Sequence, residues 1–159
     1  MDHDKQLREQ LSKVLDWHEA HADFSTAVAD FPAELRGRVP EAMPYSGWQL
    51  LEHIRIALWD IVEFSRDARH KSPDWPEGYW PKTAAPPNTT AWDKSVKSIH
   101  QHLEEMRELV TDPKQDLFAP IPHGSGQTPL RQALLIADHN AYHLGQLVLV
   151  RKALGAWKG

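Results

Sequence analysis

The sequence predicts an all-α protein, a four-helix bundle with a long crossover between its second and third helices. Two observations predict this class. Apolar residues recur with helical spacing in four separate segments, and no segment shows the alternating pattern of a half-buried strand. The second and third segments are also separated by a long stretch that is rich in proline and tryptophan. Four long helices in 159 residues fit a single domain that spans residues 1–159.

The first helix is expected over residues 4–23, because apolar side chains and one histidine follow a single helical face there. These residues are Leu7, Leu11, Val14, His18 and Ala22. The helix either continues to Asp30, or breaks near Asp23 and restarts with Ser25 as its cap. Pro32 ends it in both cases, because proline cannot continue the backbone hydrogen bonds of a helix.

The second helix is expected to begin after Pro44, where Ser46 and Gln49 have the spacing of a capping box. Its inward face carries Leu50, His53, Ala57, Ile61 and Phe64. The long connection follows over residues 72–88, and a segment of that length can cross the bundle and make the second and third helices parallel. Its aromatic residues either pack on the side of the bundle or overhang the mouth of a pocket.

The third helix is expected to start at Thr89 or Thr90, directly after two prolines. Asp112 and Pro113 stop it. Its apolar face consists of Trp92, Val96, Ile99, Leu103, Met106 and Val110. This clean helical spacing predicts that one side of the helix faces the core.

The fourth helix is expected to begin with Thr128 as cap and Pro129 in the first helical position, and to end near Leu154 with Gly155 as C-terminal cap. It carries two apolar stripes on roughly opposite sides. One stripe is Leu130, Leu134, Ala137, Ala141, Leu144 and Val148, and the other is Ile136, His139, His143, Leu147 and Val150. A helix that is apolar on both sides is buried on both sides. We therefore expect this helix to pack in its own bundle and against a second subunit, in a symmetric homodimer.

The composition argues against several classes of function. A net charge of −4 without clusters of lysine and arginine argues against a nucleic-acid partner. Charges interrupt the apolar runs and the N-terminus is polar, so we expect no membrane span, no signal peptide and a cytoplasmic location. The chain contains no cysteine, which excludes disulfides and thiolate metal ligands. A metal site must therefore use histidine, aspartate or glutamate.

Three histidines lie on apolar helix faces. His139 and His143 are four residues apart in the predicted fourth helix, so both rings leave the same face about 6 Å apart along the axis. His53 lies on the inward face of the second helix. Burying an imidazole without a partner costs free energy, and three such residues on two helices favour a shared divalent metal. The alternative is that the three rings hold no metal and fill the core.

The neighbouring residues narrow the kind of metal site. Asn140 stands where H-E-x-x-H proteases carry their general base, so that protease mechanism is set aside. The inward Glu-x-x-His pairs of di-iron bundles are also absent from the sequence. What remains is a mononuclear site with three neutral nitrogen ligands and at least one open position for water or substrate.

These residues resemble a known family, the DinB/YfiT-like superfamily. The matching residues are Trp48, His53, His139, His143, Gly145 and Gln146. The resemblance extends from about Leu11 to Lys152 and implies a four-helix bundle with a long crossover, usually a homodimer. It implies a metal held by His53, His139 and His143, with zinc or nickel first and iron or manganese as other candidates. The activities it implies are metal-dependent hydrolysis and transferase or isomerase chemistry with bacillithiol, mycothiol or glutathione.

The function predicted from these observations is a mononuclear metal-dependent enzyme with a small-molecule substrate. The reaction would be hydrolysis, or transfer that depends on a low-molecular-weight thiol, since a metal lowers the pKa of a bound water or thiol. The alternative function is a metal-binding stress or interaction module without turnover. Neither alternative involves a nucleic acid or a membrane.

Four further residues have two interpretations each. His21 is the candidate catalytic residue, as a base, a fourth ligand or an outer partner of a ligand, unless it is only a polar residue at the end of a core face. Asp60 either orients a ligand histidine or is solvated. Tyr142 and Gln146 either bond substrate or close a contact between helices. His102, which stands beside the apolar face of the third helix, is expected at the surface.

Overall fold

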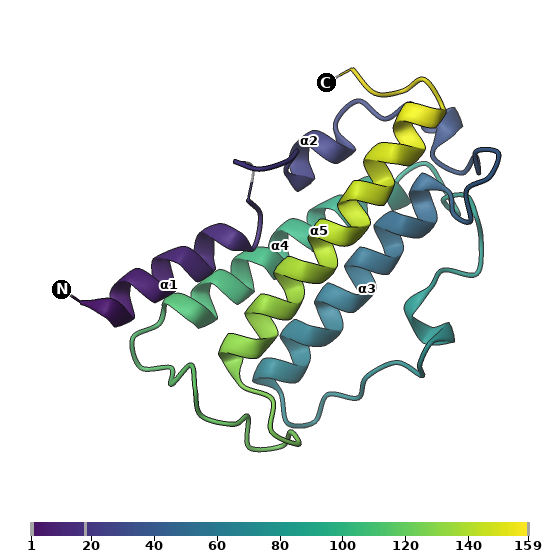
Figure 1. Cartoon of the computed structure of the whole chain (residues 1–159). Coiled ribbons are helices and arrows are strands. Elements are labelled where there is room, and N and C mark those ends of the chain that lie inside the picture. The colour runs from purple at the N-terminus through teal and green to yellow at the C-terminus, as the bar shows by residue number, and fades with distance from the viewer. Residues whose placement is uncertain (1, 18, 159) are drawn as a thin grey trace.

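The computed structural model describes residues 2–17 and 19–158, and within these residues it is helical, with no strand (Figure 1). His18, which the sequence placed on the face of the first helix, lies outside the described residues. The four long helices are α1 (His3–Val14), α3 (Gly47–Arg66), α4 (Ala91–Thr111) and α5 (Pro129–Ala153). The short helices in the connections are α2 (Phe24–Val28), η1 (Ala33–Leu35) and η2 (Glu77–Tyr79). The all-α fold and the four-helix bundle are thereby confirmed.

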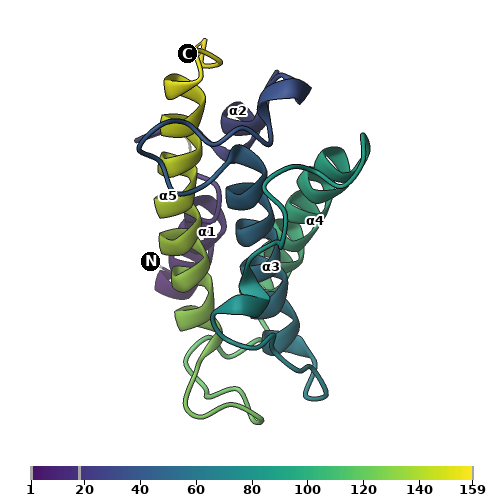
Figure 2. The ribbon, with the colours of Figure 1, turned by 90° about the vertical axis from the view of Figure 1, so that its right-hand side faces the viewer.

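The second and third long helices, α3 and α4, are parallel. Ser95, near the start of α4, hydrogen-bonds Glu52 near the start of α3. Glu105, farther along α4, lies 3.2 Å from Arg66 at the end of α3. The chain between them must return along the length of the bundle, and Figure 2 shows this crossover running over α3 with η2 within it. The predicted long crossover is therefore confirmed.

The first helix is shorter than the sequence predicted. It ends at Val14, and the backbone N–H of Phe24, at the start of α2, donates to the Asp16 carboxylate over 2.9 Å. Asp23, not Ser25, is the cap of α2, because its side chain accepts from a backbone N–H in the first turn. Short aspartate side chains compete with a continuous helix by bonding the backbone groups that the helix would pair. This competition explains the early end.

The other predicted helix caps differ in the hydrogen bonds that they make. Ser46 and Gln49 form the complete capping box at the start of α3, with N–H···O distances of 3.2 and 3.0 Å. Thr128 caps α5 with its side chain, whereas Thr90 makes no side-chain capping bond to α4. Gly155 has a φ of 69°, and its N–H returns to the last turn of α5, as in a glycine C-cap.

The core lies between the long helices and receives apolar side chains from all of them. Its largest fully buried members include Leu51, Ile54, Leu58, Ile99, Met106 and Leu147. Two buried arginines each join a long helix to a neighbouring segment. Arg8 of α1 donates to the carbonyls of Val110 and Asp112 at the end of α4, and Arg151 of α5 donates to the carbonyl of Ala27 in α2. No helix among the described residues is long and apolar enough to span a membrane.

Candidate metal centre

Three histidines from two helices meet where α3 and α5 are in contact. The Nε2 atom of His53, in α3, lies 3.1 Å from the Nε2 atom of His143 and 3.1 Å from that of His139, both in α5. His53 and His143 are buried and His139 is half-buried. Their ligand atoms all lie within 4.8 Å of one another, so this group can hold a metal ion. Residues about ninety positions apart in the sequence therefore share one point in space.

Hydrogen bonds at the outer nitrogens fix the tautomers of two of these rings. His53 Nδ1 donates to the carbonyl oxygen of Tyr79 over 2.8 Å, and His143 Nδ1 donates to Oε1 of Gln146 over 2.8 Å. A carbonyl oxygen only accepts, so the proton of each neutral ring is on Nδ1 and the lone pair is on Nε2. This is the arrangement of a histidine that is prepared to bind a metal through Nε2.

The spacing of the Nε2 atoms fits a shared cation. Two neutral acceptor nitrogens at 3.1 Å repel each other unless a proton or a metal lies between their lone pairs. Two imidazole nitrogens that each bind zinc at about 2.0–2.1 Å lie roughly 3.0–3.5 Å apart. The observed distance of 3.1 Å is within that range. The donor set and its spacing therefore fit a divalent metal.

His139 differs from the other two rings. Its Nδ1 atom is buried and has no well-aligned hydrogen-bond partner among the described residues. The same holds for Oδ1 of Asn140, the next residue in α5. The orientation of the His139 ring therefore depends on packing more than that of His53 or His143.

All three rings are held in the neutral form. Burial, together with charge repulsion from the neighbouring His143 and His53 rings, lowers the pKa of His139 to about 4. Burial also lowers the pKa of His53, against the opposing effect of its bond to the Tyr79 carbonyl, and lowers the pKa of His143. Metal binding requires neutral imidazoles, so near pH 7 the group is in the form that binds.

The crossover covers one side of this group. The indole of Trp80 stacks on the His53 ring, with centroids 3.9 Å apart and an angle of 2° between the planes. The Tyr45 ring stacks on Trp80 in turn, with centroids 4.2 Å apart. By contrast, Trp75 is 76% exposed. Of the two alternatives for the crossover aromatics, packing on the side of the bundle applies to Trp80, which lies against His53 and the core, whereas Trp75 is exposed.

Asp60 holds the crossover in place. It is 8% exposed, so the interpretation as a solvated residue is wrong. Its carboxylate accepts from the Tyr79 hydroxyl over 2.7 Å and from His70 Nε2 over 2.8 Å. Burial, with the bond to Asp60, raises the pKa of Tyr79 to about 12. Asp60 makes no direct bond to a ligand histidine, but it anchors the residue whose carbonyl orients His53.

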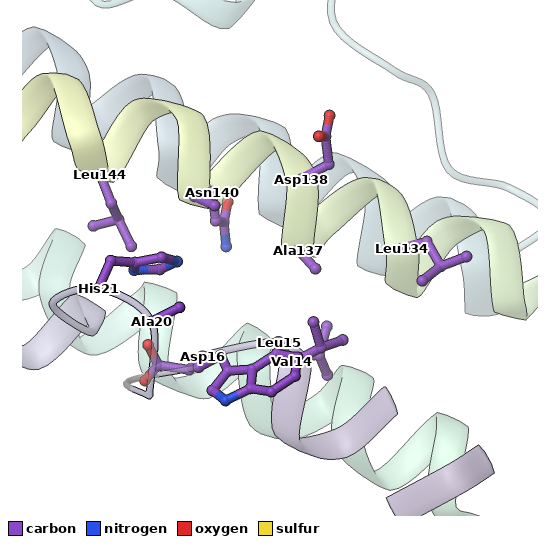
Figure 3. Close-up of a pocket in the computed structure, with 12 residues that line it drawn as sticks. Val14, Leu15, Asp16, Ala20, His21, Leu134, Ala137, Asp138, Asn140 and Leu144 are labelled. Atoms are coloured by element: carbon purple, nitrogen blue, oxygen red, sulfur yellow. The ribbon is translucent and has the colours of Figure 1, made fainter. Parts of the chain in front are cut away.

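The remaining candidates lie at different distances from the three rings. Gln146 bonds His143, so its role is to orient that ring. Tyr142 is 65% exposed, and its ring edge lies against His143 with centroids 4.9 Å apart. His21 is exposed, lies on the connection between α1 and α2, and is not a member of the three-histidine group. Figure 3 shows His21 beside a separate cavity along α5.

Sequence reasoning missed a second group that can hold a metal ion, formed by Glu63, His102 and Glu105. His102 is 8% exposed and donates through Nδ1 to the carbonyl of Ser98 over 2.7 Å, so the expectation of a surface position is wrong. Arg66 forms ion pairs with both glutamates, so its guanidinium already compensates part of their negative charge. The group depends on which residues of α3 and α4 face each other, and this pairing is not determined by the sequence of either helix alone.

Comparison with known proteins gives one match. The model of the DinB superfamily matches residues 16–147, a region that includes α3, the crossover, α4 and the histidine-bearing part of α5. No curated protein and no solved structure matches the chain significantly. The matched region contains all three histidines whose nitrogens converge. The chain belongs to the DinB superfamily.

Proposed function

We propose that this protein is a mononuclear metal-dependent enzyme, in one domain over residues 1–159, in which His53, His139 and His143 hold a divalent ion. The observation that carries the proposal is the convergence of three Nε2 atoms, two of them on rings whose outer N–H groups are fixed by hydrogen bonds. Imidazole ligands suit zinc and nickel, which we propose first, and also iron or manganese.

The donor set supports catalysis on a small-molecule substrate. Three neutral ligands leave the ion its full charge, and among the described residues no fourth imidazole or carboxylate joins the group. When bound, such an ion acts as a Lewis acid and lowers the pKa of a coordinated water or thiol. The reaction we propose is hydrolysis, or transfer with a low-molecular-weight thiol. A cofactor must supply that thiol, because the sequence contains no cysteine.

The chain's own residues prepare the site in two ways. Tyr79 and Gln146 orient His53 and His143, so that the ligand nitrogens need not reorganise when the ion binds. Trp80 covers one face of His53, while Tyr142 stands exposed beside His143. We propose that substrate approaches on the side of Tyr142, because the crossover closes the side of Trp80.

The alternative function is a metal-binding stress or interaction module without turnover, in the same proposed cytoplasmic location. The two functions differ in what completes the coordination of the metal. Replacing the metal with cobalt(II) and adding a small anion such as azide tests for an exchangeable position through the visible absorption spectrum. A changed spectrum supports the enzyme. A spectrum that azide leaves unchanged supports the module.

The outward face of α5 supports a homodimer as the working assembly. Leu134, Tyr142 and Leu149 are 50%, 65% and 53% exposed, and they lie about two turns apart from one another along one helix. Burying such residues against their copies in a second subunit removes apolar surface from water. A two-fold contact along α5 would also place Tyr142, and with it the exposed side of the metal site, near the partner.

Metal analysis tests the proposed function. Protein purified without a nickel column should contain about one zinc or nickel per chain, or take up one on addition. His53→Ala should lose this metal while its circular dichroism stays helical, because only one of three ligands and no helix cap is removed. His102→Ala, a buried histidine of the other group, is the matched control and should keep the metal. Unchanged metal affinity in His53→Ala contradicts the assignment.

A further inference from the structure

The three converging rings leave one tautomer undetermined. The Nδ1 protons of His53 and His143 are fixed by hydrogen bonds to carbonyl oxygens, so the Nε2 atoms of these two rings are bare acceptors. His53 Nε2 nevertheless lies 3.1 Å from His139 Nε2, which is within hydrogen-bond distance. A hydrogen bond between two ring nitrogens requires a proton on one of them. Of the three rings, only His139 can supply that proton while no metal is bound.

His139 can carry its proton on Nε2 because no well-aligned partner among the described residues holds a proton on its buried Nδ1 atom. With the proton on Nε2, the His139 ring donates to His53 Nε2. This bond relieves only one of the close contacts. The Nε2 atoms of His53 and His143, also 3.1 Å apart, remain two bare acceptors that face each other. The group therefore still favours a cation over the proton of His139.

Metal binding through His139 Nε2 requires the proton to leave that atom. A ligand nitrogen binds a metal through its lone pair, so the neutral ring must then carry its proton on Nδ1. The proton on Nε2 is released to water and another is taken up at Nδ1, so that the ring stays neutral and the number of bound protons does not change. In the metal-bound form, Nδ1 is therefore a buried donor that needs an acceptor.

Asn140 offers that acceptor. The residue is 6% exposed, and its Oδ1 atom also lacks a well-aligned partner among the described residues. Figure 3 shows the amide nitrogen directed toward the connection between α1 and α2, with the oxygen on the opposite side. Burial lowers the pKa of His139, whereas hydrogen bonding with the Asn140 amide raises it, so the amide lies within bonding range of the ring. Because His139 Nε2 faces His53, Nδ1 is the ring nitrogen that remains for the amide.

The two unpaired atoms are complementary in only one tautomer. While the proton is on Nε2, His139 Nδ1 and Asn140 Oδ1 are both acceptors and cannot bond each other. Once the proton is on Nδ1, the ring donates and the amide oxygen accepts. This bond orients the third ligand in the way that carbonyl oxygens already orient His53 and His143.

We infer that His139 changes its tautomer when the metal binds, from a proton on Nε2 to a proton on Nδ1, and that Asn140 is the positioning residue that accepts the new hydrogen bond. The inference rests on the proposed metal site. It identifies the residue that completes the outer hydrogen bonds of that site. It also distinguishes His139 from the other two ligands, whose tautomers are the same with and without the metal.

Long-range ¹H–¹⁵N NMR spectra of the histidine rings test the tautomers, because a protonated ring nitrogen and a bare one resonate in separate ranges. Spectra of the full chain are recorded at neutral pH without metal and with one equivalent of zinc, and single histidine variants assign the rings. We expect His139 to move its proton from Nε2 to Nδ1 on addition of zinc, and His53 and His143 to keep theirs on Nδ1. His102, whose Nδ1 donates to the Ser98 carbonyl over 2.7 Å, is the internal control and should not change.

Variants of Asn140 test its role as the acceptor. Asn140→Leu should weaken zinc binding by about tenfold, as measured by chelator competition, because the outer hydrogen bond of His139 is lost. Asn140→Asp keeps an acceptor oxygen and should restore most of the affinity. A carboxylate is also the stronger acceptor, so His139 Nδ1 should carry a proton in this variant even without zinc. Gln132→Leu is the matched control, because Gln132 is another buried amide of α5, 3% exposed and about two turns before Asn140.

Several results overturn the inference. They are a proton on His139 Nδ1 in the metal-free wild type, a His139 tautomer that does not change when zinc binds, and a zinc affinity that Asn140→Leu leaves unchanged or that Gln132→Leu weakens equally. If Asn140→Leu does not fold, the spectra of the wild type and of Asn140→Asp decide. Failure of the proposed function is observed differently. A chain that binds neither zinc nor nickel in the metal analysis overturns both proposals, whereas a chain that binds zinc without the change at His139 overturns only this one.

Discussion

The orientation of each histidine in the candidate metal centre depends on what binds its second nitrogen. A backbone carbonyl holds His53 and the side chain of Gln146 holds His143, whereas Nδ1 of His139 has no well-aligned partner among the described residues. Outer hydrogen bonds of this kind orient the ring and increase the basicity of the ligand nitrogen. The acceptor for His53 is the backbone carbonyl of Tyr79, which no substitution removes. The acceptor for His143 is the side chain of Gln146, so a substitution at Gln146 can remove that hydrogen bond.

Gln146→Leu should weaken zinc binding by about 10- to 100-fold, because the His143 ring loses the acceptor that fixes its tautomer. Gln146→Glu keeps an acceptor at the same place and should restore most of the affinity. A chelator-competition titration measures both variants. Equal affinity in Gln146→Leu and wild type would show that packing alone orients His143.

The metal-free protein should become less stable as the pH falls from about 6.5 to about 4. In the unfolded chain a histidine binds a proton near its ordinary pKa of 6.5, but in the folded chain burial lowers the pKa of His139 to about 4 and also lowers the pKa values of His53 and His143. Between these values the unfolded state binds more protons, so the free energy of unfolding decreases with falling pH.

Urea unfolding of the metal-free protein at about pH 7, 6, 5 and 4 measures this effect. The variant His139→Leu is the control, because it removes the group with the largest stated shift and retains the carboxylates that titrate in the same range. We expect the free energy of unfolding to depend less steeply on pH in the variant than in the wild type. The same slope in both proteins would contradict the assigned burial effect.

At the scale of single elements, the start of α3 joins two parts of the fold. Ser46 is fully buried, forms the capping box with Gln49 and donates from its hydroxyl to the carbonyl of Ala84 near the end of the crossover. One side chain therefore caps the helix that carries His53 and attaches the segment that follows Trp80. Thr90 has the corresponding position before α4 but makes no side-chain capping bond.

Ser46→Ala should lower the free energy of unfolding by about 1–2 kcal/mol, because it removes a cap and leaves a buried carbonyl without its donor. Thr90→Ala, the matched control, should change it by less than about 0.5 kcal/mol. Chemical denaturation of both variants gives the comparison. Equal losses would show that the capping box adds little to the stability of α3.

At the scale of the whole molecule, α5 is the central helix. It contacts α1, α2, α3 and α4, carries two of the three histidines and also lines the cavity beside His21. The apolar stripe that contains Leu134 is only partly covered within one chain, because Leu134 remains 50% exposed, and Leu149, which belongs to neither stripe, is 53% exposed as well. These residues are the physical basis for the proposed homodimer.

Light scattering at micromolar concentration should give the mass of a dimer. Leu149→Glu should shift the protein to the monomer mass, since it places a charge in the proposed apolar contact. Val39→Glu is the matched control, because Val39 is also exposed, at 42%, but lies outside α5. A monomer mass for the wild type, or loss of the dimer in Val39→Glu as well, contradicts the proposed interface.

The sequence by itself determined the features that depend on local chemistry. Helical spacing predicted α3, α4 and α5, and the Ser46 and Thr128 caps marked two of their starts, because each feature is set by residues within a few positions. The histidines of the candidate metal centre were found in the same way, as polar rings on apolar helix faces.

Only the tertiary structure decided what depends on segments that are distant in the sequence. The early end of α1 follows from the bond of Asp16 to the next helix, and the burial of Asp60 follows from the return of the crossover over α3. The placement of Trp80 on His53, and of His21 opposite Asn140, likewise requires the packed bundle. The physical reason is that burial and hydrogen-bond partners are properties of the assembled helices, whereas spacing and capping are properties of each helix alone.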